Sequence, residues 1–276
     1  MATVTGLMAL VACSPASKEQ QLIDQLKDGS SIIGGVPVEM PDTIAKSTIA
    51  LVATVKTTDG KDGQFICTGS LLTEDTVLTA AHCIPQVGKD FKQVALYVIF
   101  NSEIRAMKKE DIRLVVDAEI HEGYGTSTNG EDDHDIAVVR FAGPVASGYH
   151  LAKFLKDEAL LTEGTKVTLA GYGLIKTDGV TTESDDRLRK VQVEIAGNFG
   201  KHEVLLDQTQ GKGACHGDSG GPAFLDVNGE QLVWGITSRG AGKDGKDDCS
   251  LVAVYTKVMS ESAFVTKALE KLNGKK

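Results

Sequence analysis

Residues 213–222 read GACHGDSGGP, and this stretch is the most informative one for the fold. In it, Ser219 lies among glycines at positions 217, 220 and 221. Glycine permits backbone dihedral angles that other residues rarely adopt, and it lets backbone N–H groups come close to a bound atom. The stretch therefore indicates either a tight turn or a serine surrounded by backbone donors, and by itself it is compatible with both.

Two other segments contain the partners that a reactive serine needs. Leu78–Cys83 reads LTAAHC and places His82 after an apolar strand, while Asp132–Val139 reads DDHDIAVV and places Asp135 at the start of a strand of buried type. Taken singly, a histidine is more often structural and an acidic run is usually solvated. Nucleophilic serine catalysis needs a hydroxyl, an imidazole base, an orienting carboxylate and donors for the oxyanion. The three segments together supply this set.

The chain after Ile32 is a series of short runs rich in β-branched residues, with turn residues between them. The runs are Thr48–Lys56, Gln64–Leu72, Gln93–Phe100, Ile112–Ile120, Asp135–Phe141, Lys166–Gly173, Leu188–Ala196, Glu203–Asp207, Gly221–Leu225, Gln231–Ser238 and Leu251–Val258. Such runs predict the strands of an all-β barrel or sandwich. A connection at 142–150 divides them into two groups and favours two barrels. Beyond Ser260, a helix cap, apolar residues at helical spacing predict a C-terminal helix.

Composition and charge exclude several classes of protein. The 276 residues are 41% hydrophobic and 24% charged, which suits one large domain or two small ones. The longest apolar stretch, Leu7–Cys13, is far shorter than the roughly 20 residues of a membrane-spanning helix. With 29 basic and 38 acidic residues the net charge is −9, so we expect no nucleic-acid partner.

The cysteines allow two interpretations. They are Cys13, Cys67, Cys83, Cys215 and Cys249. An odd number without a C-x-x-C pair predicts two bridges and one remaining thiol in an exported protein, or five reduced cysteines in a cytosolic one.

No metal-site spacing is apparent in the sequence. The adjacent pairs His121–Glu122 and His134–Asp135 are better explained by loop solvation and by the catalytic set than by a metal. We therefore expect no metal and no cofactor.

Five motifs occur in a fixed order along the chain. They are IIGG (Ile32–Gly35), TAAHC (Thr79–Cys83), DIAVV (Asp135–Val139), GDSGGP (Gly217–Pro222) and VYTKV (Val254–Val258). Together they resemble the trypsin-like serine endopeptidases of the chymotrypsin family, over residues 32 to about 271. The resemblance implies an all-β fold of two six-stranded antiparallel β-barrels, at about 32–145 and 146–259, with the active site between them and a C-terminal α-helix at about 260–272.

The resemblance also implies a role for each matching residue. Ser219 is the expected nucleophile, His82 the general base and then acid, and Asp135 the carboxylate that orients His82. The N–H groups of Gly217 and Ser219 form the expected oxyanion hole, and Ser238 matches a serine that supports the aspartate. The family's bridges imply the disulfides Cys67–Cys83 and Cys215–Cys249, which leaves Cys13 single.

The expected specificity pocket has no carboxylate at its base. Six residues before the nucleophile, where trypsins carry an aspartate, this chain has Gly213, followed by Ala214. The wall positions Gly240 and Ala253 are small. Ser238, two residues before Gly240, is also expected to belong to the pocket. A cationic side chain would lose its hydration there without gaining a partner. We therefore predict cleavage after Phe, Tyr, Leu or Met.

The effect of two features of the expected pocket on specificity stays open. Asp247 and Asp248 lie in a loop that departs from the family's spacing, and their carboxylates could restore some preference for basic residues. Arg239 stands where the family usually has an aromatic residue. It either favours acidic residues upstream of the cut or faces solvent.

Activation is expected to require a cut before Ile32. In the family, the new N-terminal amine inserts into the protein and pairs with the aspartate before the nucleophile, here Asp218. An unpaired buried carboxylate there would be costly. The residue before the cut is Ser31 rather than Arg or Lys. This argues against trypsin-like self-activation and implies an unidentified processing protease as a partner.

The N-terminus resembles an export signal. Residues 1–13 end in GLMALVAC, which is typical of the core and cleavage region of a signal peptide. LVAC at Leu10–Cys13 resembles the bacterial lipoprotein signal and implies a bacterial protease attached to a membrane through a lipid on Cys13. No Lys or Arg precedes Cys13, so either the true start lies before Met1 or the signal is degenerate, and a buried N-terminal segment is the alternative. Polar residues 14–31 predict a tether or pro-segment.

We therefore expect an exported monomer, secreted or in the cell envelope, that hydrolyses proteins or peptides. A catalytically silent homologue used for binding or adhesion is the main alternative, although such proteins usually lose one member of the triad. An esterase is a second alternative, but Ser219 lacks the Gly-x-Ser-x-Gly elbow.

Overall fold

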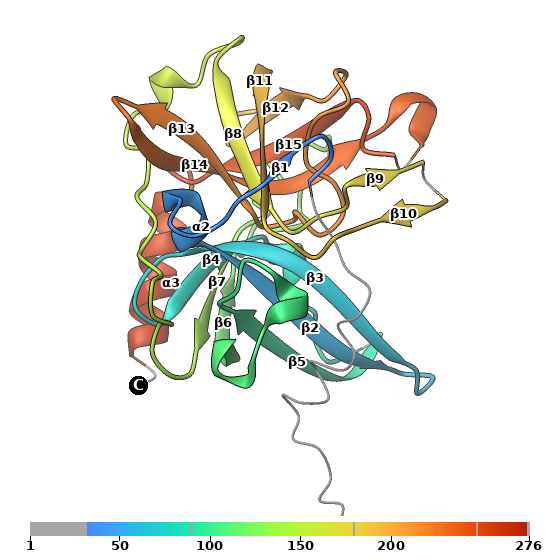
Figure 1. Ribbon diagram of the computed structural model, residues 1–276, viewed down its shortest axis with the longest axis vertical. Coiled ribbons are helices and arrows are strands. Elements are labelled where there is room, and N and C mark those ends of the chain that lie inside the picture. Colours follow the sequence, from blue (N-terminus) through green and yellow to red (C-terminus); the bar gives the residue numbers. More distant parts are fainter. Residues whose placement is uncertain (1–31, 89, 179, 247, 275–276) are drawn as a thin grey trace, which may run out of the picture.

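The computed structural model describes residues 32–88, 90–178, 180–246 and 248–274, and Figure 1 shows two β-barrels stacked on each other. The signal-like segment, residues 14–31, Cys13 and Asp247 lie outside the described residues. No helix in the described ranges is long and apolar enough to cross a membrane.

The first barrel is a closed ring of antiparallel strands in the order β2-β3-β4-β7-β6-β5. Its strands are β2 (Thr48–Thr57), β3 (Asp62–Leu71), β4 (Thr76–Thr79), β5 (Phe91–Ile99), β6 (Ile112–Ile120) and β7 (Ala137–Phe141). Strand β2 reads TIALVATVKT, and its first six residues are all buried. They are buried on both faces because β2 packs against the barrel interior on one side and contacts β8 of the second barrel on the other.

The second barrel is a ring in the order β8-β11-β12-β15-β14-β13, closed by pairing of β8 with both β11 and β13. Its strands are β8 (Lys166–Gly171), β11 (Arg189–Phe199), β12 (Glu203–Asp207), β13 (Pro222–Val227), β14 (Glu230–Ala241) and β15 (Val252–Lys257). Trp234 and Tyr255 are the largest side chains of its core. A hairpin of β9 (Lys176–Thr177) and β10 (Thr182–Glu183) projects from this barrel (Figure 1).

Both ends of the described chain cross between the barrels. Strand β1 (Val36–Pro37) pairs with β11, and Ile32 is buried in the core of the second barrel. Residues 32–37 therefore pack on the second barrel, whereas the sequence placed them with the first. Helix α3 (Ser262–Asn273) packs against β6 and β7 of the first barrel (Figure 1).

The prediction of two six-stranded antiparallel barrels with a C-terminal helix is confirmed. Several short elements were not predicted: β1, β9, β10 and helix α2 (Thr43–Ser47), which Asp42 caps, while β4 was indicated only as the apolar strand before His82. The predicted cap at Ser260 is wrong, because Glu261 is the N-cap residue of α3 and the Ser260 hydroxyl donates to the Glu158 carboxylate instead. The 3-10 turns are η1 (Ala81–Cys83), η2 (Ile104–Ala106), η3 (Lys109–Asp111), η4 (Glu158–Leu160) and η5 (Lys243–Gly245).

Candidate active site

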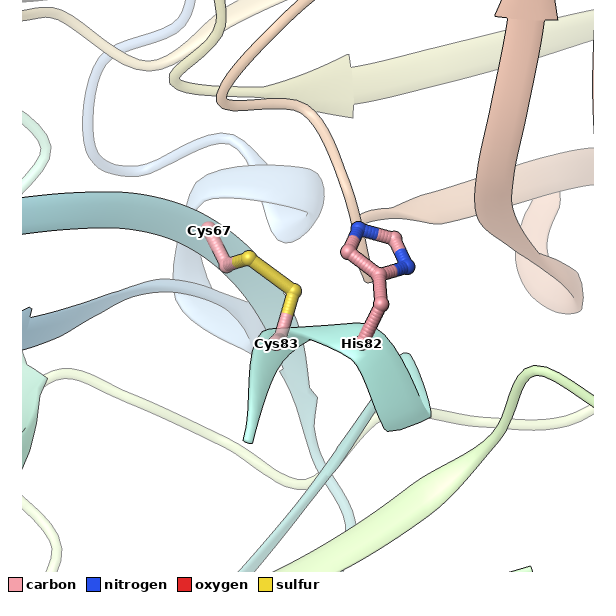
Figure 2. A group of neighbouring side chains, drawn as sticks. All are labelled: Cys67, His82 and Cys83. Carbon is pink, nitrogen blue, oxygen red and sulfur yellow. A yellow bond between two sulfur atoms is a disulfide. The ribbon is translucent and has the colours of Figure 1, made fainter. Parts of the chain in front are cut away.

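His82 lies in η1, directly after strand β4 of the first barrel. A disulfide joins Cys83 to Cys67 in β3, so η1 is covalently held against that strand. Figure 2 shows the imidazole and the disulfide beside each other on the same side of η1. About a third of the His82 side chain is exposed (32%), so the ring can reach both the protein and a bound substrate.

Asp135 precedes β7 and is almost fully buried (2% exposed). Its Oδ1 accepts the backbone N–H of His82 at 3.0 Å, and its Oδ2 lies 2.7 Å from His82 Nδ1. The Ser238 hydroxyl also donates to Oδ2 at 2.7 Å. Because an ionised carboxylate only accepts hydrogen bonds, Nδ1 carries the ring proton and Nε2 is left as the basic nitrogen.

Ser219 lies in the loop between β12 and β13 of the second barrel, and this loop packs on the first barrel. A Cβ added at Gly220 would lie 2.0 Å from Thr79 Oγ1 and 2.9 Å from Ala80 N, so only glycine permits this approach to the segment that leads into His82. The backbone N–H of Thr68 in β3 donates to the Ser219 carbonyl at 2.8 Å. The nucleophile loop and the histidine segment are therefore in direct contact.

Within the described part of the chain, the hydroxyl of Ser219 and the N–H groups of Gly217 and Ser219 form no hydrogen bond. Gly217 has a φ of 94°, which turns its peptide out of the regular path of the chain. Two unpaired backbone donors beside a free hydroxyl can bind an oxyanion. The structure thus brings Ser219 beside the histidine segment, without a hydrogen bond between Ser219 and His82.

Asp218, between these two donors, is a buried carboxylate with no cationic partner among the described residues. It is 1% exposed and accepts hydrogen bonds from Gly173 N at 2.6 Å and Cys215 N at 2.8 Å. Burial raises its pKa to about 7, although both hydrogen bonds act in the opposite direction. No ion pair or hydrogen bond joins Asp218 to Ile32 among the described residues, but Ile33 pairs through its backbone with Gly213 in the same region.

A cavity of about 250 Å³ opens beside Ser219. It is lined by Ala214, Cys215, His216, Ser219, Thr237, Ser238, Arg239, Gly240, Cys249 and Ala253. Four of the predicted pocket residues are in this lining, and the fifth, Gly213, is not. A Cβ at Gly213 would lie 2.0 Å from Gln208 Oε1, because the buried Gln208 side chain bridges Ala214 N and the Cys249 carbonyl behind the cavity.

The second predicted disulfide, Cys215–Cys249, forms one wall of the cavity. Among the described residues no carboxylate lines the cavity, and Asp248 instead accepts the N–H of Ser250 at 3.1 Å. Arg239 neither faces solvent freely nor carries an unpaired charge. Its guanidinium binds both carboxylate oxygens of Glu203, at 2.7 and 2.8 Å. Burial alone would lower the pKa of Arg239, but Glu203 outweighs this effect and raises it.

A cluster of histidines around Glu261 was not predicted from the sequence. His121 Nε2, His134 Nδ1 and His202 Nδ1 lie 3.3, 2.7 and 2.9 Å from oxygens of the buried Glu261 carboxylate. The residues come from four separate segments, which explains why no spacing pattern revealed them. Burial lowers the pKa of His121, although the Glu261 charge opposes this shift.

The histidine cluster has the residue types of a metal site but not its geometry. His121 Nδ1 accepts the N–H of Gly123 at 2.9 Å, so the proton of the neutral ring is on Nε2, toward Glu261. The His121 and His134 rings are stacked, with centroids 4.6 Å apart and planes 9° apart. An ion lies near the plane of each imidazole that binds it, and stacked rings do not share such a point. The arrangement fits a carboxylate held by imidazoles.

Comparison with known proteins gives consistent matches. The family model described as trypsin matches residues 42–265. Brachyurin of Leptuca pugilator is 35% identical over 190 residues, covering 65% of this chain and 78% of that protein. The venom peptide isomerase heavy chain of Agelenopsis aperta is 28% identical over 233 residues, covering 75% and 90%.

A solved structure described as HL collagenase has the same fold. It superposes with a TM-score of 0.64, and the match covers 86% of this chain and 97% of that chain, at 19% sequence identity.

A further sequence relative is chymotrypsin of Phaedon cochleariae. It is 33% identical over 210 residues, which cover 70% of this chain and 68% of that protein.

Proposed function

The chain belongs to the trypsin family and is a serine endopeptidase, and on this premise we propose that Ser219, His82 and Asp135 carry out the hydrolysis. The observation that supports this most is the hydrogen bonding of the Asp135 carboxylate. Its Oδ2 lies 2.7 Å from His82 Nδ1 and also accepts the Ser238 hydroxyl. That contact leaves Nε2 of His82 directed away from Asp135, as a base for the Ser219 hydroxyl.

In the proposed reaction, His82 Nε2 takes the Ser219 hydroxyl proton while Oγ forms a bond to the substrate carbonyl carbon. The carbonyl oxygen becomes an oxyanion and is bound by the N–H groups of Gly217 and Ser219. His82 returns the proton to the leaving amine as the peptide bond breaks, and an acyl-enzyme remains on Ser219. Water repeats the sequence and releases the acid, while Asp135 stabilises the imidazolium in both halves.

An organofluorophosphate tests this assignment, because only an activated serine reacts with it quickly. We expect stoichiometric labelling at Ser219, and loss of both labelling and peptidase activity in Ser219→Ala. The exposed Ser262 of helix α3 provides the matched control, Ser262→Ala, which should keep both. A wild-type protein that is folded and correctly processed but remains unlabelled would favour the silent binding homologue.

The proposed specificity is for apolar or aromatic residues before the cut bond. It is supported by the small residues Ala214, Gly240 and Ala253 in the cavity lining and by the lack of a carboxylate among its described residues. Chromogenic peptides that differ only in this residue provide the measurement. We expect faster hydrolysis after Phe, Leu or Met than after Arg or Lys, and the reverse order would reject the proposal.

The proposed activation is a cut between Ser31 and Ile32. The buried Asp218 carboxylate supports it, because no described residue gives it a cation and a new ammonium at Ile32 would supply that charge. The Ile32 side chain is already buried in the second barrel. Mass spectrometry of the active enzyme should find Ile32 at the N-terminus, and full activity of a chain that retains residues 14–31 would contradict the proposal.

The proposed location is outside the cytoplasm, with a lipid on Cys13. The two disulfides support export. The relatives named above are animal proteins, so a bacterial origin and the lipid rest on Leu10–Cys13 alone. Mass spectrometry of the precursor, before the cut at Ile32, decides between a diacylglycerol-modified Cys13 and an unmodified secreted chain.

A further inference from the structure

Glu203, at the start of β12, is a fully buried carboxylate (0% exposed) that binds groups from both barrels. Arg239 in β14 holds both of its oxygens. The other two partners belong to the loop that leads into Asp135, since Asp132 N donates to Oε2 at 2.9 Å and Asp133 N to Oε1 at 3.4 Å. An ionised carboxylate has about four acceptor positions, and here all four are used.

The loop at 130–134 has a conformation that its own sequence does not favour. Gly130 has a φ of 80°, and the non-glycine residues Asp132 and His134 have φ values of 53° and 51°. Non-glycine residues at such φ values are strained and persist where the surrounding structure enforces them. Here the second barrel provides the restraints, because Arg239 Nη2 donates to the Gly130 carbonyl at 2.5 Å and the Asp132 carboxylate accepts the N–H of His202 at 2.6 Å.

Arg239 also acts on the residue that supports Asp135. Its Nη1 lies 3.1 Å from the Ser238 hydroxyl, which donates in turn to Asp135 Oδ2. A guanidinium can only donate, so it directs the Ser238 proton toward Asp135. The ion pair therefore reaches Asp135 along two routes, through the loop at 130–134 and through Ser238.

We propose that Glu203 and Arg239 form a positioning pair that sets the location of Asp135 and thereby the orientation of the His82 imidazole. The pair does not touch the reacting atoms. Its charges cancel within the protein, so Arg239 does not serve as a binding site for acidic residues of the substrate, although it lines the cavity.

The first test uses Glu203→Gln and Arg239→Lys in the active enzyme, with a short chromogenic peptide amide. Glu203→Gln keeps the side-chain length but removes one acceptor oxygen, and Arg239→Lys keeps the positive charge but cannot make the two-point contact. We expect kcat to fall about 10- to 100-fold, as for other small displacements of a catalytic group, with KM within about threefold of wild type. Glu230→Gln is the matched control, since Glu230 pairs with Lys153 at the opposite end of β14, and it should retain full kcat.

The pH profile of kcat/KM provides a second measurement, because a loss of stability alone does not shift it. In Glu203→Gln the Arg239 charge is no longer neutralised near Asp135, and a looser Asp135 stabilises the imidazolium less. Both effects disfavour protonated His82, so the acid limb of the profile should shift to lower pH. An unchanged profile, or a defect confined to KM for substrates with acidic residues, would refute the positioning role.

The double variant Glu203→Leu with Arg239→Leu separates positioning from folding. Replacing a buried ion pair by apolar residues of similar size often leaves stability unchanged. We therefore expect a folded protein with a near-native melting temperature, faster hydrogen exchange in residues 130–135 and a kcat as low as in the single variants. A double variant with wild-type kcat would show that the pair contributes only to folding.

Discussion

At the scale of single residues, Thr68 joins the first barrel to the nucleophile loop. Its Oγ1 donates to the Gly217 carbonyl at 2.9 Å and accepts the N–H of Tyr172 at 3.1 Å. The Gly217 carbonyl belongs to the peptide between the two proposed oxyanion donors. One buried hydroxyl on β3 therefore helps to orient a site on the other barrel.

Thr68→Val removes this hydroxyl and keeps the side-chain volume. It leaves a buried carbonyl and a buried N–H without partners, so we expect the free energy of unfolding to fall by about 1–3 kcal/mol. We also expect kcat to fall by up to about 100-fold as the oxyanion donors lose their orientation. Urea denaturation and steady-state kinetics measure the two effects.

Thr48→Val is the matched control for this change. Thr48 is equally buried, but its hydroxyl has no hydrogen-bond partner within the described residues. Its removal should leave stability equal or higher and kcat unchanged. Equal losses in both variants would mean that the hydrogen bonds of Thr68 have no special role.

Gly213 shows at the same scale why the pocket base differs from the sequence-based expectation. Gly213→Ala would place a Cβ against Gln208, whose side chain makes two buried hydrogen bonds. We expect a loss of about 1–3 kcal/mol, as for other overpacked sites. A double-mutant cycle with Gln208→Ala should show a smaller combined loss than the sum of the two.

Gly88→Ala is the control for the Gly213 variant, because an added Cβ at Gly88 meets no atom within 4 Å. Additive losses for Gly213→Ala and Gln208→Ala would disprove the predicted contact.

At the scale of elements, the two disulfides hold different parts of the site. Cys67–Cys83 ties η1 to β3, over a sequence separation of 16, and Cys215–Cys249 forms a wall of the cavity, over a separation of 34. The Cys67–Cys83 bridge therefore fixes the segment that contains His82. The Cys215–Cys249 bridge helps to shape the cavity in which a substrate side chain would bind.

Replacing either bridge by an alanine pair should lower the free energy of unfolding by roughly 3 to 4 kcal/mol. The kinetic effects should differ. Loss of Cys67–Cys83 frees η1 and should lower kcat, whereas loss of Cys215–Cys249 widens the cavity and should mainly raise KM for apolar substrates. Steady-state kinetics on one peptide series measures both, and identical kinetic changes in the two variants would argue against this division.

At the scale of the whole molecule, Asp218 couples the proposed activation to stability. The pKa of Asp218 is raised from 3.8 to about 7 by burial in the uncut chain. The folded form thus retains a proton that the unfolded form releases above pH 4, so the unfolding free energy falls as the pH rises from about 4 to 7. Between about pH 5 and 8 the loss is on the order of 3 kcal/mol.

After the cut, an Ile32 ammonium should keep Asp218 ionised and remove most of this pH dependence. Urea unfolding at pH 5 and 8 compares the two forms, with Ser219→Ala present in both to prevent self-digestion. Uncut Asp218→Asn, which cannot ionise, should also lack the dependence. Equal pH slopes for cut and uncut protein would exclude an Ile32–Asp218 ion pair.

The strands show how far local sequence patterns reach at this scale. The runs Ile112–Ile120 and Glu203–Asp207 were predicted with the observed bounds. Strand β4 was indicated only as an apolar strand before His82, without bounds, because TVLT is too short to show a period, and it becomes a strand by pairing with β3 and β7. Residues 32–37 were placed with the wrong barrel because only tertiary pairing with β11 decides their position.

The sequence by itself determined the family, the two-barrel fold and the identity of the candidate triad, because these depend on local motifs and on the alternation of apolar residues. Only the tertiary structure decided the partners of charged groups that are distant in the chain. The pairing of Arg239 with Glu203, the histidines around Glu261 and the packing of Gln208 behind Gly213 are of this kind. A charge is paired by whatever group folding brings within about 3 Å, and sequence spacing does not encode that distance.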